Sequence, residues 1–298
     1  MIGKKTANKI FASDMTIIMV GAKGSGKTNF ASVLMEMLVS LGYQIWTNIH
    51  FFDYDDVEEA IKINKLKKDI EYHKKPDEVH VVSTTHELLK GLVGKGKKVV
   101  FLDEAGIHAS SSQPMSKATV SIKQLAYIIR HFDACLVIIA QVEGSIPPDL
   151  REKLVDWKIK VAKSRRSISF GKREVVEDEF GDEHITFPTN NGYQHIKHSQ
   201  YPYDSNFPSG FEIDMDLKKA LAELSKLGSS IEVMKYGADV IEKLHKESKK
   251  NGPKTLSKKD LVIAAFENGN NNLKEVSKMC NTGYQYVKGI HSDWKRGM

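Results

Sequence analysis

Residues 21 to 28 have the residue types and the spacing that bind phosphate groups. They read GAKGSGKT, a complete match to the pattern GxxxxGK[ST], and they lie between a predicted strand and a predicted helix. In this pattern glycines let backbone N–H groups point at phosphate oxygens, and the start of the helix adds a favourable partial charge. An ordinary glycine turn is the alternative. The residues that we expect to hold ATP are Gly21, Gly24, Ser25, Gly26, Lys27 and Thr28. Lys27 would reach the β- and γ-phosphates, and Thr28 would ligate Mg²⁺.

An acidic pair, Asp103 and Glu104, directly follows the apolar run VVFL at residues 99–102. A carboxylate at the end of such a strand could hold the Mg²⁺ from its other side, which we expect of Asp103. Glu104 could act as the general base that polarises the attacking water. Surface charge is the alternative interpretation of the pair. Two adjacent carboxylates favour ATP hydrolysis over nucleotide binding alone.

Two further polar residues could complete such a site. Gln141 ends the apolar run LVIIA, where it could sense the γ-phosphate or orient water. A strand-end amide that bonds to loop backbone groups is the alternative. Arg130 precedes Gln141 by one helix end and one strand. In a ring of subunits this arginine could stabilise transition-state charge in a neighbour's site, and a surface salt bridge is the alternative.

The elements that must position these residues follow a repeated strand-helix order. Unbroken apolar runs are typical of strands that are buried on both faces of a parallel sheet. The predicted strands span residues 15–20, 43–49, 79–82, 99–102 and 136–140, with helical patterns at 29–41, 88–93 and 120–132. This order predicts an α/β fold with a mostly parallel central sheet and helices on both of its faces.

The segment after Gln141 predicts the edge of that sheet. Residues 157–162 alternate like a half-exposed edge strand, and residues 167–187 alternate around a Gly-Asp turn like an antiparallel hairpin. Residues 195–211 contain two prolines and predict an irregular crossing loop.

The chain of 298 residues is long enough for one large domain and a small second one. Residues 1–215 would form the phosphate-binding domain, with a charged insertion at about 53–78 that we interpret as solvated surface. Residues 216–252 are charged and helical in pattern, and we expect a helical linker there. The sequence Asn251-Gly252-Pro253 would end it and begin a module at 253–298.

Three short helical patterns in this last module, at 257–267, 273–279 and 284–295, resemble a helix-turn-helix of the winged-helix-like kind. Basic and amide side chains on its last helix suit the major groove of DNA. The residues that we expect to contact DNA are Gln285, Lys288, His291, Lys295 and Arg296. A three-helix packing module with no DNA role is the alternative.

Composition limits the partners and the compartment. A net charge of +6 favours a polyanionic partner such as nucleic acid. The two cysteines lie far apart, which argues against a disulfide framework or a zinc site and favours the cytoplasm. The histidines at positions 73, 80, 86 and 108 show no ligand spacing. No apolar run approaches the ~20 residues that span a bilayer, so we expect no membrane insertion.

Together, the motifs GAKGSGKT, VVFLDE and IIRHFDACLVIIAQ resemble the FtsK/HerA group of ring-forming DNA-pumping ATPases. Within that group, residues from about 15 to 165 most resemble the zonula-occludens-toxin-like branch and the packaging ATPases of archaeal viruses. The resemblance implies a RecA-like core and a hexamer with ATP bound between subunits. It also implies Glu104 as the base, Gln141 as the sensor and Arg130 as the finger that acts on the neighbouring subunit.

We therefore expect an ATP-driven motor on double-stranded DNA, serving genome packaging or DNA transfer in a virus or mobile element. A viral capsid or portal protein is the further partner that this function would bring. Filamentous-phage members of the toxin-like branch carry a membrane segment, and its absence here favours packaging. The alternatives are an ATP-switched, site-specific replication or partition factor, and a phage or pilus assembly ATPase that acts on protein.

Overall fold

The computed structural model describes most of the chain in two compact units, residues 1–245 and residues 246–298. The described residues are 4–103, 117–163, 167–178, 183–193, 197–204, 210–250, 273–279, 287–288 and 290–291. Glu104, Gln285, Lys295 and Arg296 lie outside them, so their expected roles stay predictions.

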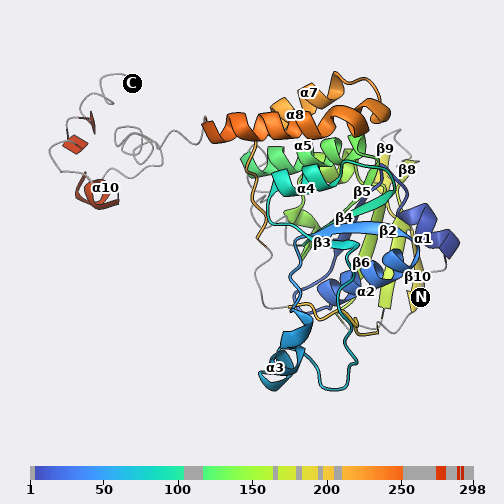
Figure 1. The fold of residues 1–298 in the computed structure, drawn as a ribbon. Coiled ribbons are helices and arrows are strands. Elements are labelled where there is room, and N and C mark those ends of the chain that lie inside the picture. Colours follow the sequence, from blue (N-terminus) through green and yellow to red (C-terminus); the bar gives the residue numbers. More distant parts are fainter. Residues whose placement is uncertain are drawn as a thin grey trace. The chain divides into compact units, whose positions relative to one another are not determined.

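Within the described residues, the first unit is built on an eight-stranded sheet in the order β10-β7-β6-β1-β5-β4-β2-β3. Figure 1 shows this sheet together with the helices that pack on it. Strands β6, β1, β5, β4, β2 and β3 run parallel, and β7 and β10 run antiparallel at one edge. Their bounds are β1 (Thr16–Val20), β2 (Tyr43–Thr47), β3 (Val79–Val81), β4 (Lys97–Asp103), β5 (Ala134–Ala140), β6 (Trp157–Val161), β7 (Ser167–Lys172) and β10 (Thr189–Tyr193). The predicted α/β fold with a mostly parallel central sheet is confirmed.

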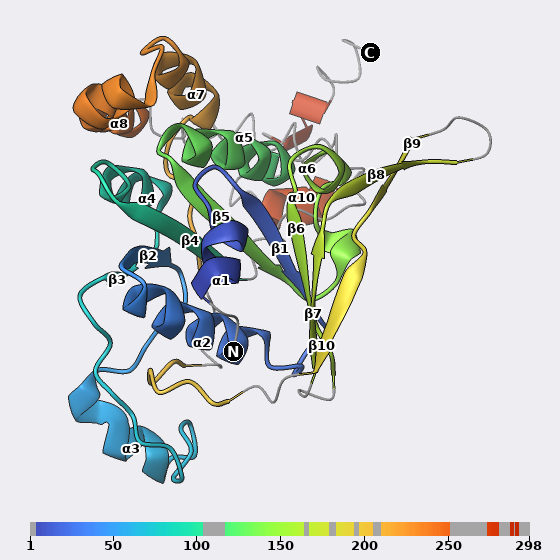
Figure 2. The same ribbon diagram turned by 90° about the vertical axis from the view of Figure 1, so that its right-hand side faces the viewer.

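Helices cover both faces of the sheet, and β1 shows how its residues divide between them (Figure 2). Ile17 and Met19 pack on one face against α1 (Lys4–Ile10) and α2 (Lys27–Ser40). Ile18 and Val20 pack on the other face with α4 (Thr85–Gly91), α5 (Lys117–His131) and α6 (Pro148–Lys153). Because successive strand residues point to opposite faces, a strand covered on both sides must be apolar throughout.

We expected a helical linker at 216–252. The segment forms two helices, α7 (Leu217–Ser225) and α8 (Ser230–Lys250), which pack on the first unit. Apolar side chains of both helices, such as Leu224 and Ile241, are fully buried in the same core as α5. The helices therefore form an outer layer of the first unit up to His245 (Figure 1). Although both helices are rich in charged residues, each has one apolar face, and that face must be buried against another element.

The insertion at 53–78 contains less helix than its sequence pattern suggests. Only η1 (Tyr54–Asp56) and α3 (Val57–Lys62) form, and Asn64 adopts a left-handed conformation with φ of 57°. The N–H groups of Lys65 and Leu66 then turn back to the carbonyl of Ala60. This turn ends the helix and buries Leu66 in a small local cluster.

The sheet continues beyond the strand that we predicted as its edge. Strand β6 lies between β1 and the antiparallel β7, so the prediction of an edge strand there is wrong. The predicted hairpin region divides in two, since β7 joins the main sheet while β8 (Glu174–Glu177) pairs with β9 (Glu183–Thr186). Figure 2 shows this two-stranded ladder extending away from the sheet.

In the second unit the described residues are 246–250 at the end of α8, helix α10 (Leu273–Met279) and four residues after it. Val276, Val287 and Ile290 are buried, as the core of a small module requires. Lys288 is exposed and His291 is half-buried. The helix-turn-helix arrangement and its DNA contacts stay predictions.

A buried lysine at the start of β4 makes folding stability depend on pH. The ammonium of Lys98 donates to the carbonyl of Phe132 at 2.9 Å, and burial lowers its pKa to about 8. Between that pH and the ordinary value near 10.5 the unfolded chain binds the extra proton, so this group adds stability as pH rises.

We therefore predict that Lys98→Met loses this part of the pH dependence. In urea unfolding, the unchanged protein should gain stability relative to the variant between pH about 8 and 10. The exposed Lys95→Met is the control and should follow the unchanged protein. A constant difference between Lys98→Met and the unchanged protein across this range would contradict the prediction.

Candidate nucleotide-binding site

Three of the predicted site segments meet at the edge of the sheet that is formed by the carboxyl ends of its parallel strands. Val20, the last residue of β1, lies opposite Ala140, the last residue of β5. Asp103, the last residue of β4, lies opposite Ile139 on the other side of β5. The loop that starts at Gly21, the residue Gln141 and Asp103 therefore follow three neighbouring parallel strands, with Gln141 in the middle.

The backbone of the loop at 21–28 requires glycine at two positions. A Cβ on Gly21 would lie 2.4 Å from the carbonyl oxygen of Val161 at the end of β6. Gly26 has a φ of 89° and caps α2 without a side-chain hydrogen bond. The hydroxyl of Ser25 is buried and has no hydrogen-bond partner among the described residues. A helix start of this kind leaves N–H donors and a hydroxyl for an anion, as a phosphate-binding loop needs.

Lys27, the first residue of α2, is folded over this loop. Its ammonium donates to the carbonyl of Gly21 at 2.7 Å and to that of Ala22 at 3.2 Å, and the residue is only 8% exposed. A cation held beside the loop N–H groups increases the attraction of this edge for a polyphosphate.

Thr28 and Asp103 connect the start of α2 to the end of β4. The Thr28 hydroxyl donates to Oδ2 of Asp103 at 2.8 Å, and Asp103 is buried. A hydroxyl and a carboxylate are hard oxygen ligands of the type that Mg²⁺ prefers. The two predicted Mg²⁺ ligands therefore lie side by side, next to the loop that would hold the phosphates.

Asn48 was not among the predicted site residues, although two hydrogen bonds from its side chain hold the backbone of Asp103. Its Oδ1 accepts from the N–H of Asp103 at 2.7 Å, and its Nδ2 donates to the carbonyl of Asp103 at 2.9 Å. Asn48 follows the end of β2 and is 1% exposed. The predicted strand at 43–49 placed Asn48 inside the strand, and its role becomes visible only through the pairing of β2 with β4.

The sequence predicted a crossing loop at 195–211 but did not reveal its contacts with α2. We call its residues 197–204 the strap. The Asn29 side chain donates to the carbonyl of Lys197 at 2.9 Å and accepts from the N–H of Ser199 at 3.1 Å. The Glu36 carboxylate accepts from the N–H groups of Gln200 and Tyr201 at 2.6 and 3.1 Å. The predicted crossing loop thus fastens the outer face of α2, beside Thr28.

Arg130 lies at the opposite edge of the sheet. Its guanidinium donates to the carbonyl of Asp14 at 2.8 Å and to Oδ2 of Asp156 at 3.0 Å. The same carboxylate oxygen accepts from the N–H of Thr16 at 2.8 Å, at the start of β1. The salt bridge that we weighed as an alternative is therefore present, and Arg130 is far from its own subunit's loop. A role in a neighbouring subunit stays a prediction.

The parallel sheet carries a GxxxxGK[ST] loop, an aspartate that accepts a hydrogen bond from the threonine of that loop, and a glutamine at the end of the strand between them. Together these features define a P-loop protein. Residues 15–202 match the family model of the zonular occludens toxin, Zot, and the chain belongs to that family. The predicted resemblance to the toxin-like and packaging branch of P-loop ATPases is confirmed.

Solved structures resemble the chain over 59% of its length. They include the DNA-packaging ATPase of Sulfolobus turreted icosahedral virus, with 16% identity, 98% of that chain covered and a TM-score of 0.36. The genome-packaging NTPase of Sulfolobus turreted icosahedral virus 2 with ATP-γS shows 14% identity, 98% coverage and a TM-score of 0.35. The N-terminal domain of the Neisseria meningitidis zonular occludens toxin shows 18%, 96% and 0.32. A search of curated proteins finds no match.

Within the described residues, no helix is both long and apolar enough to cross a membrane.

We predict that Asn48→Ala weakens the Mg²⁺-dependent part of nucleotide binding. The change removes both bonds to the buried backbone of Asp103, which should lower stability by about 1–3 kcal/mol and let the carboxylate turn away from Thr28. In titrations with a fluorescent ATP analogue, affinity with Mg²⁺ should fall by about 10-fold or more, as for other residues that orient a ligand.

Asn8→Ala is the matched control for this prediction. Asn8 is also hydrogen-bonded, accepting from Tyr43 at 3.1 Å, but it lies at the opposite edge of the sheet. Its removal should leave nucleotide affinity unchanged. An Asn48→Ala protein that is folded and gains as much affinity from Mg²⁺ as the unchanged protein would contradict the assignment.

Proposed function

We propose that the protein is an ATPase whose site is the edge formed by residues 21–28, Asp103 and Gln141. The observation that carries the proposal is the contact between Thr28 and Asp103 beside the loop. An ordinary glycine turn, which binds no nucleotide and no Mg²⁺, does not require this contact. Membership of the Zot family supports the same class of protein.

Each described residue has a role that follows from its position. The loop N–H groups, Ser25 and Lys27 would hold the phosphates, while Thr28 and Asp103 would be ligands of Mg²⁺. Gln141 follows the strand between them, so its amide can reach the γ-phosphate or orient water. Glu104 is the general base that we expect one residue beyond the metal ligand.

We further propose that hydrolysis drives movement of double-stranded DNA, in a hexameric ring that packages or transfers a viral or mobile genome. Support comes from the resemblance to DNA-pumping ATPases, the net charge of +6 and the basic residues predicted in the second unit. A capsid or portal protein is the partner that a packaging role would require.

The test is ATP turnover with and without long duplex DNA at low salt. DNA should stimulate turnover, and added salt should remove the stimulation because Lys and Arg contacts to phosphate release counterions. Glu104→Gln should bind ATP and lose most hydrolysis, and Lys27→Ala should lose binding or turnover. Turnover that is equal with and without DNA would refute the motor and leave the ATPase, whereas a fully active Glu104→Gln would refute the assignment of the base.

A separate prediction concerns Arg130. If it completes a neighbour's site, Arg130→Ala should bind ATP without turning it over, and mixing it with Lys27→Ala should restore part of the turnover. In such a mixture, some sites combine an intact loop with an intact arginine.

Asp156→Asn is the control for this experiment. It breaks the 3.0 Å ion pair of Arg130 while leaving the arginine in place. Equal loss of turnover in Asp156→Asn and Arg130→Ala, with no recovery on mixing, would assign Arg130 a structural role only.

A further inference from the structure

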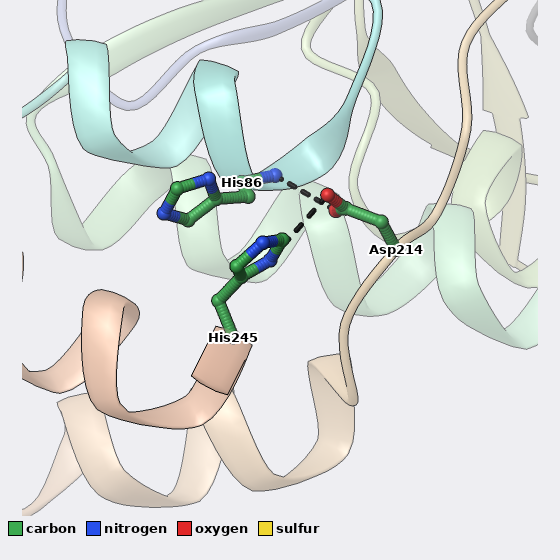
Figure 3. A group of neighbouring side chains, drawn as sticks. All are labelled: His86, Asp214 and His245. Atoms are coloured by element: carbon green, nitrogen blue, oxygen red, sulfur yellow. Dashed lines mark hydrogen bonds and ion pairs between the residues drawn. The ribbon is translucent and has the colours of Figure 1, made fainter. Parts of the chain in front are cut away.

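Three metal-ligating side chains converge in the first unit, on the sheet face that α4, α5, α7 and α8 cover. They are His86 of α4, Asp214 in the segment before α7, and His245 of α8 (Figure 3). Each offers one ligand atom, and these atoms all lie within 4.8 Å of one another. Nothing in the proposed ATPase mechanism uses them.

Backbone hydrogen bonds fix two of these residues relative to each other. The N–H of Thr85 donates to the carbonyl of Glu212 at 2.9 Å, and the N–H of Glu212 donates to the carbonyl of Ser83 at 2.8 Å. The N–H of His86 then donates to Oδ1 of Asp214 at 3.0 Å. One carboxylate oxygen is thereby bound by the backbone, and the orientation of the other is set.

That second oxygen faces the histidine of α8. Oδ2 of Asp214 lies 3.5 Å from Nδ1 of His245, whose side chain is 9% exposed, and the side chains of Asp214 and His86 are each 17% exposed. A carboxylate this far from solvent needs a positive partner. The rings of His86 and His245 stack with centroids 3.8 Å apart and an interplanar angle of 18°.

A second carboxylate lies at the same place. Oε2 of Glu242 is 3.1 Å from Nε2 of His86 and 3.6 Å from the ammonium of Lys90. The cluster therefore combines two imidazoles and two carboxylates, with Lys90 beside one of the carboxylates, on three segments of chain. Imidazole nitrogens and carboxylate oxygens are both common ligands of divalent metal ions.

We propose that His86, Asp214 and His245 form a zinc site. Two nitrogen ligands and one carboxylate oxygen suit Zn²⁺, which takes them at about 2.0–2.2 Å in tetrahedral geometry. Neighbouring ligand atoms are then about 3.4 Å apart, and the ion lies in the plane of each imidazole. Binding therefore draws the ligands together and turns at least one ring out of the stacked arrangement. The ring torsion of histidine is soft enough for this change.

Zinc at this position would cross-link the outer layer of the first unit. The three ligands are 128 and 31 residues apart in sequence, and His245 is the last residue of the unit. Binding to the folded state alone stabilises it by mass action. The site would hold the last turns of α8 within the first unit against α4, independently of the nucleotide.

The experiment is a titration of the chelator-treated full chain with Zn²⁺ in excess Mg²⁺. We expect one strongly bound Zn²⁺ per chain, a rise in Tm on binding, and visible absorption of a tetrahedral site when Co²⁺ replaces Zn²⁺. Asp214→Asn and His245→Gln keep the size of the side chains, and each should weaken zinc binding by about 10- to 100-fold or more. His86→Gln, at the less buried histidine, provides a further variant if either of the others fails to fold.

Two controls locate the bound zinc. His184→Gln removes an exposed histidine that pairs with Asp178 at 2.7 Å, and it should keep full zinc affinity. Asp103→Asn should also keep it, since excess Mg²⁺ and this change both remove the nucleotide site as a competitor. The proposal is overturned if the unchanged protein binds no zinc, or if folded variants of the three ligands bind it as well as the unchanged protein. The cluster is then a hydrogen-bonded ion pair between Asp214 and a protonated histidine.

Discussion

The hydrogen bond between Thr28 and Asp103 sets the strictest requirement on the structure. It joins the first turn of α2 to the last residue of β4, and β5 lies between the two strands that lead there. The bond can form only if β1, β5 and β4 end at the same level, which their register ensures. Asn48 extends the requirement to β2, because its amide bonds to both backbone groups of Asp103. Polar contacts thus link the ends of β1, β4 and β2 at one edge of the sheet, with β5 between β1 and β4.

Charged groups at the opposite edge fix where the strands begin. The carboxylate of Asp156 bonds to the N–H of Thr16 and to Arg130, which connects the starts of β6 and β1 with the end of α5. The ammonium of Lys98 reaches the carbonyl of Phe132 from the start of β4. Each contact lets a charged or polar group stay near the core because a partner compensates it. Ordered polar contacts at both edges leave little freedom for the strands to slip.

The sequence predicted the parts of the fold and of the site that local pattern determines. Unbroken apolar runs located β1, β4 and β5, since a strand buried on both faces has no polar side chain to interrupt it. The glycine loop carries its own signature, and polar residues at strand ends pointed to Asp103 and Gln141. In the structure all three follow neighbouring parallel strands that end at one edge of the sheet.

Residues whose roles depend on distant partners could not be found in this way. Asn48 is recognised only when β2 is known to lie beside β4. Helices α7 and α8 looked like a linker because the surface that they cover is assembled from segments about 100 residues earlier. His86 showed no ligand spacing, since Asp214 and His245 approach it only in the folded chain. Register, layer and cluster are long-range properties, and a local pattern of residues does not contain them.

The strap connects helix α2, which begins at the glycine loop, with the segment around the insertion. Asn29 and Glu36 hold the strap to α2, and its residues Gln200 and Pro202 accept from the N–H groups of His73 and Phe52 in the segment around the insertion. Helix α2 begins at Lys27 and Thr28, so the residues that would hold phosphate and metal belong to the same rigid element. A shift of α2 relative to the sheet must therefore carry the strap and the insertion with it, or break the hydrogen bonds that join them. The insertion is therefore linked through the strap to the helix that begins at Lys27 and Thr28, although its sequence is typical of solvated surface.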